Sequence, residues 1–345
     1  MEISTIGLDL AKNVFQVHGV SKEGAVIVRK PLRRAQMLPF FAKLSPCLVG
    51  IEACGTSHHW ARELQNLGHE VRLMPPSYVK PYVKRGKKDA VDAEAICEAV
   101  TRPTMRFVAV KSREQQAALS LHRVRRLLTG QRTQLVNMMR SQLAEFGTAI
   151  PVGLGRALHV AQQIADGEAV ANLPPQAAQV ISMLCELMLK LHAQLHKLDL
   201  RLEALRRTDD TARRLATIPG IGPIGATALA ASVSDPHQFK SGRQFAAWLG
   251  LTPRQKSSGG KERLGRITKM GDKYLRQLLV IGATSLIRRA KHSPATVHPF
   301  LVGMLARKSA RVASVAMANK MARIAWAVMT RGEVYQSSHA PASVA

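Results

Sequence analysis

The order of apolar runs in the first hundred residues most constrains what this chain can fold into. Three short runs, at residues 3–10, 14–20 and 25–29, have the composition and alternation of β-strands. Only three residues separate the first two runs, which indicates a hairpin. A helix near residues 35–44, a strand at 47–52, a helix at 56–67, a strand at 70–74 and a helix beginning near Asp89 are expected to follow.

Three strands in a meander, followed by alternating helices and strands, predict an α/β domain with a mixed sheet. This order is typical of the ribonuclease H-like architecture, in which acidic residues stand at strand ends. The actin-like kinase fold shares the same core, so the order alone leaves both open. The absence of a glycine-rich phosphate loop near Asp9 disfavours the kinase.

The middle of the chain is predicted to be helical. Ser112 and Gln115 form a capping-box pattern that begins one helix. An apolar stripe then runs through Leu121, Val124, Leu128, Leu135, Met138 and Phe146, and after a looser stretch (151–175) leucines recur every three or four residues at 184, 187, 191, 195, 198, 202 and 205. This pattern predicts a coiled-coil-like seam, which serves either an intramolecular helical hairpin or a dimerisation arm.

The expected domains are therefore an α/β domain at 1–108, a helical coiled-coil region at 109–207 and a mostly helical C-terminal domain at 208–334. Residues 335–345 are expected to form a flexible tail.

The net charge predicts a polyanionic partner. Lysine and arginine total 50 against 23 acidic residues, for a formal charge of +27. Neutralisation of phosphates drives most non-specific nucleic-acid binding, so nucleic acid is the first candidate. A membrane is disfavoured because the basic residues recur along the whole chain instead of forming one amphipathic helix. The uncharged segment 215–234 is interrupted by Pro219, Gly220, Gly222, Pro223 and Gly225, which makes it a poor spanning helix. The four cysteines are scattered, which fits a reducing cytosol.

Four acidic residues form the first candidate site. Asp9 and Glu52 each end a predicted strand, and neighbouring strands would bring them together. Asp89 and Asp92 are three residues apart, which places them on one face of a helix. Such a set is suited to Mg²⁺, with Mn²⁺ as the alternative ion, and to phosphodiester chemistry. Taken singly, each has a simpler explanation: Asp89 caps a helix, Glu52 is an ordinary strand-end charge and Asp9 pairs with Lys12.

Two basic segments are candidate nucleic-acid contacts. The first, Lys84, Arg85, Lys87 and Lys88, directly precedes Asp89 and would line a groove leading to the acids; the alternative is a solvated loop. The second follows a glycine-rich loop that contains Ser257 and Ser258, and consists of Lys261, Arg263, Arg266 and Lys269. By its chemistry alone Ser258 is an ordinary loop serine, because no histidine or aspartate stands beside it to activate its hydroxyl.

Residues 218–226 have the form of a helix-hairpin-helix turn. Gly220 and Gly222 would let the backbone approach a phosphate, and the following helix would present free N–H groups to it. The alternative is a tight helical hairpin without a ligand.

The motifs around the four acids resemble a known family, the DEDD transposases of IS110 elements, whose acidic domain is similar to the Holliday-junction resolvase RuvC. They read GLDLAK at 7–12, GIEA at 50–53 and KDAVDA at 88–93. The resemblance implies that Asp9, Glu52, Asp89 and Asp92 are the metal-binding catalytic tetrad. It extends to the family's second domain through IPG at 218–220, GLTP at 250–253, SGG at 258–260 and GDKYLR at 271–276. It assigns the catalytic serine to Ser258, with Ser257 as the alternative one position away.

The resemblance further implies a bacterial insertion-sequence transposase, closer to the IS1111 group, in the cytoplasm and associated with the nucleoid. Members cut and rejoin DNA through a phosphoserine linkage, with donor and target chosen by a structured bridge RNA. They act as homo-oligomers, dimers or tetramers, in which the acidic domain of one subunit meets the serine domain of another. Metal held by the tetrad would then lower the pKa of the Ser258 hydroxyl.

Two other functions remain open from the residues. One is a resolvase-like, structure-specific endonuclease that uses water and forms no covalent link to DNA. The other is a nucleic-acid-binding protein without catalytic activity.

Overall fold

The computed structural model describes residues 2–84, 89–168, 173–256, 263–294 and 297–336. The chain divides into two compact units, residues 1–113 and 114–345, and each is described by itself.

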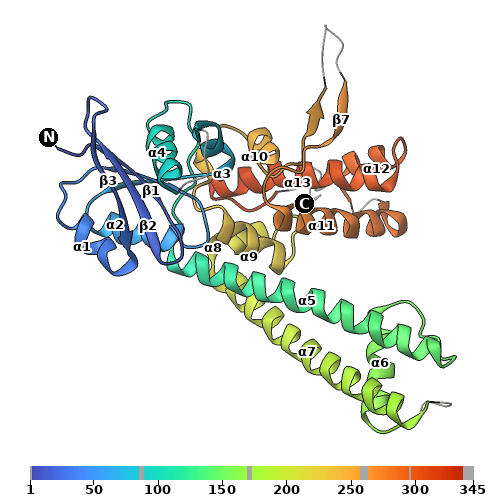
Figure 1. The fold of residues 1–345 in the computed structure, drawn as a ribbon. Coiled ribbons are helices and arrows are strands. Elements are labelled where there is room, and N and C mark those ends of the chain that lie inside the picture. Colours follow the sequence, from blue (N-terminus) through green and yellow to red (C-terminus); the bar gives the residue numbers. More distant parts are fainter. Residues whose placement is uncertain (1, 85–88, 169–172, 257–262, 295–296, 337–345) are drawn as a thin grey trace. The chain divides into compact units, whose positions relative to one another are not determined.

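The first unit is built on a five-stranded mixed sheet (Figure 1). Its strands are β1 (Thr5–Asp9), β2 (Val14–Val20), β3 (Val26–Arg33), β4 (Leu48–Glu52) and β5 (Glu70–Met74), in the spatial order β3-β2-β1-β4-β5. The first three are antiparallel neighbours, whereas β4 and β5 run parallel to β1. The predicted α/β architecture with a leading meander is confirmed. The third strand continues further than predicted, to Arg33, and the first is shorter than the predicted 3–10.

Helices cover the sheet on both faces. A 3₁₀ turn (Arg34–Gln36), α1 (Met37–Phe41) and α2 (Ser57–Asn66) pack on one face, where Phe15, Leu32 and Trp60 lie in the main core. On the other face, α4 (Asp89–Val100) packs against β1, β2 and β4, after the short α3 (Pro76–Val79) and a second 3₁₀ turn (Lys80–Tyr82). The helix expected near Asp89 is thus present, and it lies directly over the strands that end in Asp9 and Glu52.

Two glycines allow α4 to approach the sheet this closely. A methyl group added at Gly7 would overlap the carbonyl oxygen of Ala93 and the amide of Cys97. One added at Gly50 would lie 2.7 Å from Cβ of Val100. Each glycine stands two residues before an acid, on the same face of its strand. In each of the motifs Gly-X-Asp and Gly-X-Glu, the glycine therefore lets α4 contact the strand, and the acid two residues later lies at the end of that strand.

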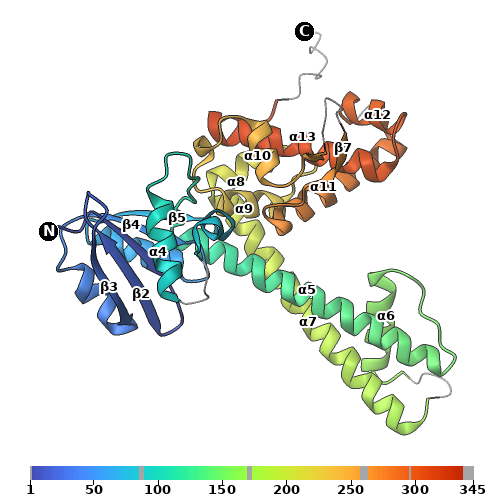
Figure 2. The ribbon, with the colours of Figure 1, turned by 45° about the horizontal axis from the view of Figure 1, so that its top comes forward.

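The second unit begins with three helices, α5 (Arg113–Glu145), α6 (Leu154–Ala165) and α7 (Pro175–Thr208) (Figure 2). The long α5 and α7 pack together with α6 in one apolar cluster, which is an intramolecular pairing. The sequence did not reveal α6. The buried seams also differ from the leucine stripes: α7 buries Ile181, Cys185, Met188, Leu195 and Leu202, while Leu187 is 52 % exposed.

The rest of the second unit is a compact helical core. Its elements are α8 (Asp210–Leu215), α9 (Pro223–Ser232), a 3₁₀ turn (Pro236–Gln238), α10 (Gly242–Trp248), the two-stranded ribbon β6 (Pro253–Gln255) and β7 (Leu264–Ile267), α11 (Lys273–His292), α12 (Pro299–Leu305) and α13 (Ala310–Arg331). The helices share one apolar core, in which α11 and α13 pack side by side. None of the described helices is long and apolar enough to cross a membrane, and the uncharged segment 215–234 contains the ten-residue, largely buried α9.

A buried polar cluster joins the long helices to this core. The His122 ring on α5 lies 3.0 Å through Nδ1 from the Tyr274 hydroxyl on α11, and 3.1 Å through Nε2 from the Thr227 hydroxyl on α9. Arg125, also on α5, donates to Asp199 on α7. Burial, and secondly Arg125, lowers the pKa of His122 to about 4. The imidazole is therefore neutral at physiological pH.

Candidate active site

Asp9 and Glu52 end two neighbouring parallel strands. Leu8 of β1 pairs with Ile51 of β4, so the next residue of each strand is one of the two acids. Both side chains are partly buried. The sequence prediction that these two strand ends are neighbours is confirmed by the sheet register.

The acids of α4 face the same strand ends. The pKa of Asp9 is raised from 3.8 to about 6, first by burial and then by the carboxylates of Asp92, Asp89 and Glu52, in that order. The pKa of Glu52 is also raised, by burial and by Asp92. A carboxylate raises the pKa of another only from nearby, because the repulsion falls with distance. The four acids therefore share one electrostatic environment at the carboxyl end of β1 and β4.

The donor set of this site fits a hard divalent cation. All four groups are carboxylates, and their mutual repulsion is the kind of excess negative charge that Mg²⁺ or Mn²⁺ relieves. Within the described ranges, however, no three His, Cys, Asp or Glu side chains converge closely enough to form a metal cage. The four acids thus fit a metal ion by their charge and their oxygen donors, but they are not already arranged as its ligands.

The basic residues predicted to lead into this site are described only in part. Lys84 is exposed and its Nζ lies 2.6 Å from Oε1 of Glu94 on α4, so it borders the helix that carries Asp89 and Asp92. Arg85, Lys87 and Lys88 lie outside the described residues.

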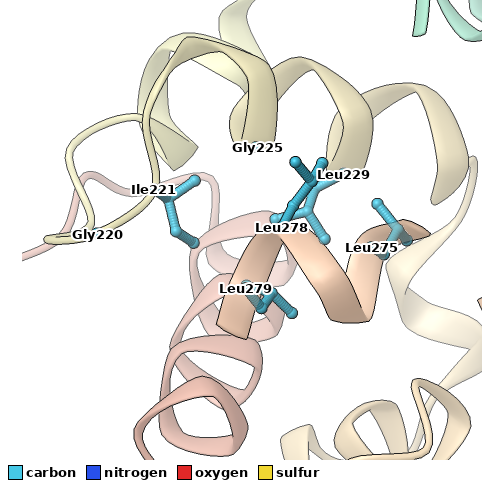
Figure 3. Close-up of a pocket in the computed structure, with 7 residues that line it drawn as sticks. All are labelled: Gly220, Ile221, Gly225, Leu229, Leu275, Leu278 and Leu279. Carbon is cyan, nitrogen blue, oxygen red and sulfur yellow. The ribbon is translucent and has the colours of Figure 1, made fainter. Parts of the chain in front are cut away.

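The glycines of the predicted helix-hairpin-helix turn lie between α8 and α9 and play different parts. Gly220 has a positive φ of 86°, and a side chain there would meet Met321 at 2.9 Å and Leu286 at 3.0 Å. Figure 3 shows this turn beside the leucines of α11. Gly220 is thus required by packing inside the protein. Gly222, by contrast, is exposed, has open space around it and caps the N-terminus of α9.

The second basic segment lies on the β6–β7 ribbon. Arg263, Arg266 and Lys269 are all exposed. Among the described residues other than glycine, Lys269 alone has a positive φ, of 56°. Ser257, Ser258 and Lys261, between the two strands, lie outside the described residues. Exposed cations therefore lie directly before β7, on it and shortly after it, where the chain leaves the serine loop.

Sequence reasoning missed the side chains next to Asp9 on the sheet. Gln16 on β2 is the register partner of Asp9, and the buried His18 is the partner of Gly7, so both lie on the face that carries the acid. Nδ1 of His18 has no hydrogen-bond partner among the described atoms. The alternation within residues 14–20 could have revealed Gln16 and His18, because every second residue of this strand lies on the same face of the sheet as Asp9.

Comparison with known proteins identifies the family. Residues 6–147 match the family model of the DEDD transposases of IS110 elements, and residues 212–298 match the model described as transposase IS116/IS110/IS902 family. A protein of Pseudomonas aeruginosa named probable family 20 transposase is 50 % identical, over 97 % of this chain and 99 % of its own length. The transposase for insertion sequence element IS1328 of Yersinia enterocolitica is 40 % identical over 96 % of this chain and 98 % of its own length. That for IS1111A of Coxiella burnetii is 39 % identical over 97 % and 92 %, respectively. This chain therefore belongs to the IS110/IS116/IS902 family of transposases, enzymes that recombine DNA.

Proposed function

We propose that this transposase cuts and rejoins DNA with Ser258 as the nucleophile and with Asp9, Glu52, Asp89 and Asp92 as a metal-binding tetrad. The observation that carries the proposal is the raised pKa of Asp9, to which all three other acids contribute. Four carboxylates from three separate elements, gathered beside two strand ends, have no evident use in stabilising the fold, because they repel one another.

The tetrad residues would hold Mg²⁺, or Mn²⁺ in its place. Bound there, the ion would supply positive charge to the phosphate and lower the pKa of the Ser258 hydroxyl. Asp9 must lose its proton to become a ligand, and burial together with Asp92 opposes this loss. The affinity of the site for metal should therefore increase as the pH rises through 6.

Ser258 would act by transesterification. Its Oγ attacks the phosphorus of one phosphodiester as the hydroxyl loses its proton. The bond to one sugar oxygen breaks, and that sugar leaves as a free hydroxyl. Attack by the hydroxyl of the other DNA strand then releases the serine and makes the recombinant joint. Each step exchanges one phosphodiester for another, so no external energy source is needed.

The exposed cations are proposed to contact nucleic acid. Arg263, Arg266 and Lys269 on the ribbon, together with Lys261, flank the serine loop. Lys84, Arg85, Lys87 and Lys88 precede the tetrad helix. In the proposed helix-hairpin-helix turn, the exposed Gly222 and the free N–H groups of α9 are suited to a phosphate, whereas Gly220 supports the turn from inside.

A guide RNA and a homo-oligomer complete the proposal. A net charge of +27 is suited to a structured bridge RNA as well as to DNA. The tetrad and Ser258 belong to different units of the chain. A dimer or tetramer would allow the acids of one subunit to act with the serine of another.

The test of the nucleophile is a covalent adduct. The purified transposase, with its co-purifying RNA and Mg²⁺, is incubated with labelled DNA carrying an element end, and denaturing gels reveal protein bound to DNA. We expect an adduct with the wild type and with Ser257→Ala, and none with Ser258→Ala. Normal cleavage by Ser258→Ala would instead support a resolvase-like nuclease that uses water.

The guide is tested separately by sequencing the RNA that remains bound after gentle purification. Enrichment of one structured RNA encoded beside the transposase gene is expected. Recombination at full rate after complete removal of RNA would contradict guidance.

A further inference from the structure

The edge strand β3 presents different residues on its two faces. Its register with β2 pairs Leu32 with Phe15 and Lys30 with Val17, and Phe15, Val17 and Leu32 are all buried in the core under α1 and α2. The alternate positions of β3, Arg29 and Arg33, therefore lie on the opposite face of the sheet.

That opposite face is the one that carries Asp9. Gln16 pairs with Asp9 on one side and with Pro31 on the other, and His18 likewise joins Gly7 to Arg29. Two strand spacings, about 10 Å, separate β1 from β3. This distance corresponds to roughly three nucleotides, at about 3.4 Å of rise each along the axis of a duplex. A DNA strand with a phosphate at Asp9 would thus reach β3 within a few nucleotides.

The β3 part of this face is uncovered. Leu32 is the one buried residue of the strand, and Arg29 and Arg33 are exposed. Neither guanidinium makes an ion pair with any carboxylate that the structure describes. Arg29 lies near Glu94 and His18, whose pKa values it lowers, but Glu94 is already bonded to Lys84. Cations therefore outnumber acids along this border of α4.

We propose that Arg29 and Arg33, with Gln16 between them and Asp9, form a docking strip for the backbone of the DNA strand that is cut. Charge complementarity with the phosphates, and continuity with the acids on the same face, favour this occupant. Four carboxylates repel an approaching phosphate, and fixed cations on the same face, a few nucleotides away, offset this repulsion. The inference rests on the proposed function, because it assumes that the scissile phosphate comes to the acids.

The strand offers its own matched control. Lys30 and Arg34 adjoin Arg29 and Arg33, carry the same charge, and lie on the other side: Lys30 is 4.4 Å from the ring centre of Phe40 and Arg34 is 5.1 Å from that of Trp60. The variants are Arg29→Gln with Arg33→Gln, against Lys30→Gln with Arg34→Gln. Both double variants lose two positive charges, so a difference in their DNA binding depends on the face of the sheet and not on the net charge. Thermal melting verifies that both are folded.

Binding is measured by fluorescence anisotropy with a labelled single-stranded oligonucleotide from the element end, in EDTA so that no cutting occurs, over a range of salt concentrations. For Arg29→Gln/Arg33→Gln we expect the slope of log affinity against log salt to decrease by about 1.4, two phosphate contacts at about 0.7 each. The Lys30→Gln/Arg34→Gln slope should equal that of the wild type.

The proposal of a docking strip would be overturned if the salt slope decreased equally in the two double variants, or if it decreased in neither. The proposal would also be overturned if Arg29→Gln/Arg33→Gln bound RNA more weakly but DNA as well as the wild type does, since RNA would then be the ligand of this face. Because the assay needs neither metal nor cutting, its outcome is separate from that of the tetrad. An Asp9→Asn protein that recombines normally would refute the proposed function, while the face-specific binding difference would still stand or fall by itself.

Discussion

Asp92, on helix α4, raises the pKa of Asp9, at the end of strand β1, more than any other charged group does. The two residues are 83 positions apart in the chain and are brought together because Gly7 and Gly50 let α4 lie directly on the sheet. Repulsion between them favours the protonated form of Asp9, and the ionised acids destabilise the fold. The chain thus gathers these acids at a cost to the stability of its fold.

The first prediction concerns the stability of the metal-free protein. The folded-state pKa of Asp9, about 6, exceeds its unfolded value, 3.8, so between these values the folded protein binds the proton more tightly. The free energy of unfolding should therefore decrease as the pH rises from about 4 to 6. At pH 7.5 in EDTA, Asp9→Asn should melt at a higher temperature than the wild type. Added Mg²⁺ should raise the melting temperature of the wild type more than that of the variant, and an equal rise in both would contradict the assignment.

The second prediction concerns the glycines beneath α4. Gly7→Ala forces a methyl group into the backbone of α4, and should lower the free energy of unfolding by about 3 kcal/mol, the upper part of the usual range for overpacking. Gly55→Ala is the control, because nothing lies within 4 Å of a methyl group there. Urea denaturation measures both. Equal stability of the two variants would show that α4 does not rest on β1 as described.

These glycines illustrate what the sequence reveals and what it conceals. The strands, α2 and the acid positions were predictable, because alternation and strand-end acids are local patterns. The reason for Gly7 is not local, since it depends on a helix that begins 82 residues later. For the same reason Gly220 was expected to face phosphate, yet it packs against Met321 and Leu286.

The long helices show a second limit of the sequence. Counting leucines predicted the buried seam of α7 only in part. Leu195 and Leu202 are buried as expected, but Ile181, Cys185 and Met188 fill the rest of the seam, and Leu187 is exposed. The intervening helix α6 was missed although its sequence is amphipathic, with Ala157, Ala161 and Ile164 buried on one face. The buried His122 also carries no signal in sequence, since its partners lie more than a hundred residues away.

The third prediction concerns His122. Its folded-state pKa, about 4, lies below the unfolded value, 6.5, so the unfolded chain binds the proton first as the pH falls. The free energy of unfolding contributed by His122 should therefore decrease between pH 6.5 and 4, by up to about 1.4 kcal/mol per pH unit. His122→Gln should abolish this dependence. Urea denaturation of both proteins at pH 7 and 5 measures it, and an identical pH dependence in the two would show that His122 is not buried in its neutral form.

The fourth prediction concerns the β6–β7 ribbon. If Arg263 and Arg266 each contact one phosphate of duplex DNA, replacing either with Gln should decrease the slope of log affinity against log salt by about 0.9. Lys22→Gln is the control, since Lys22 follows β2 at the end of the sheet away from Asp9. Unchanged slopes for both ribbon variants would exclude the ribbon from DNA contact.

The most direct test of the tetrad is the yield of recombinant joints between element and target DNA, measured with RNA-loaded transposase in Mg²⁺. Asp9→Asn and Asp92→Asn remove carboxylates from the site, whereas Glu70→Gln changes an acid at the opposite end of the sheet. We predict that both tetrad variants bind DNA normally but form joints at least about a hundredfold more slowly, while Glu70→Gln is unimpaired. Joint formation by Asp9→Asn at the wild-type rate would contradict the account.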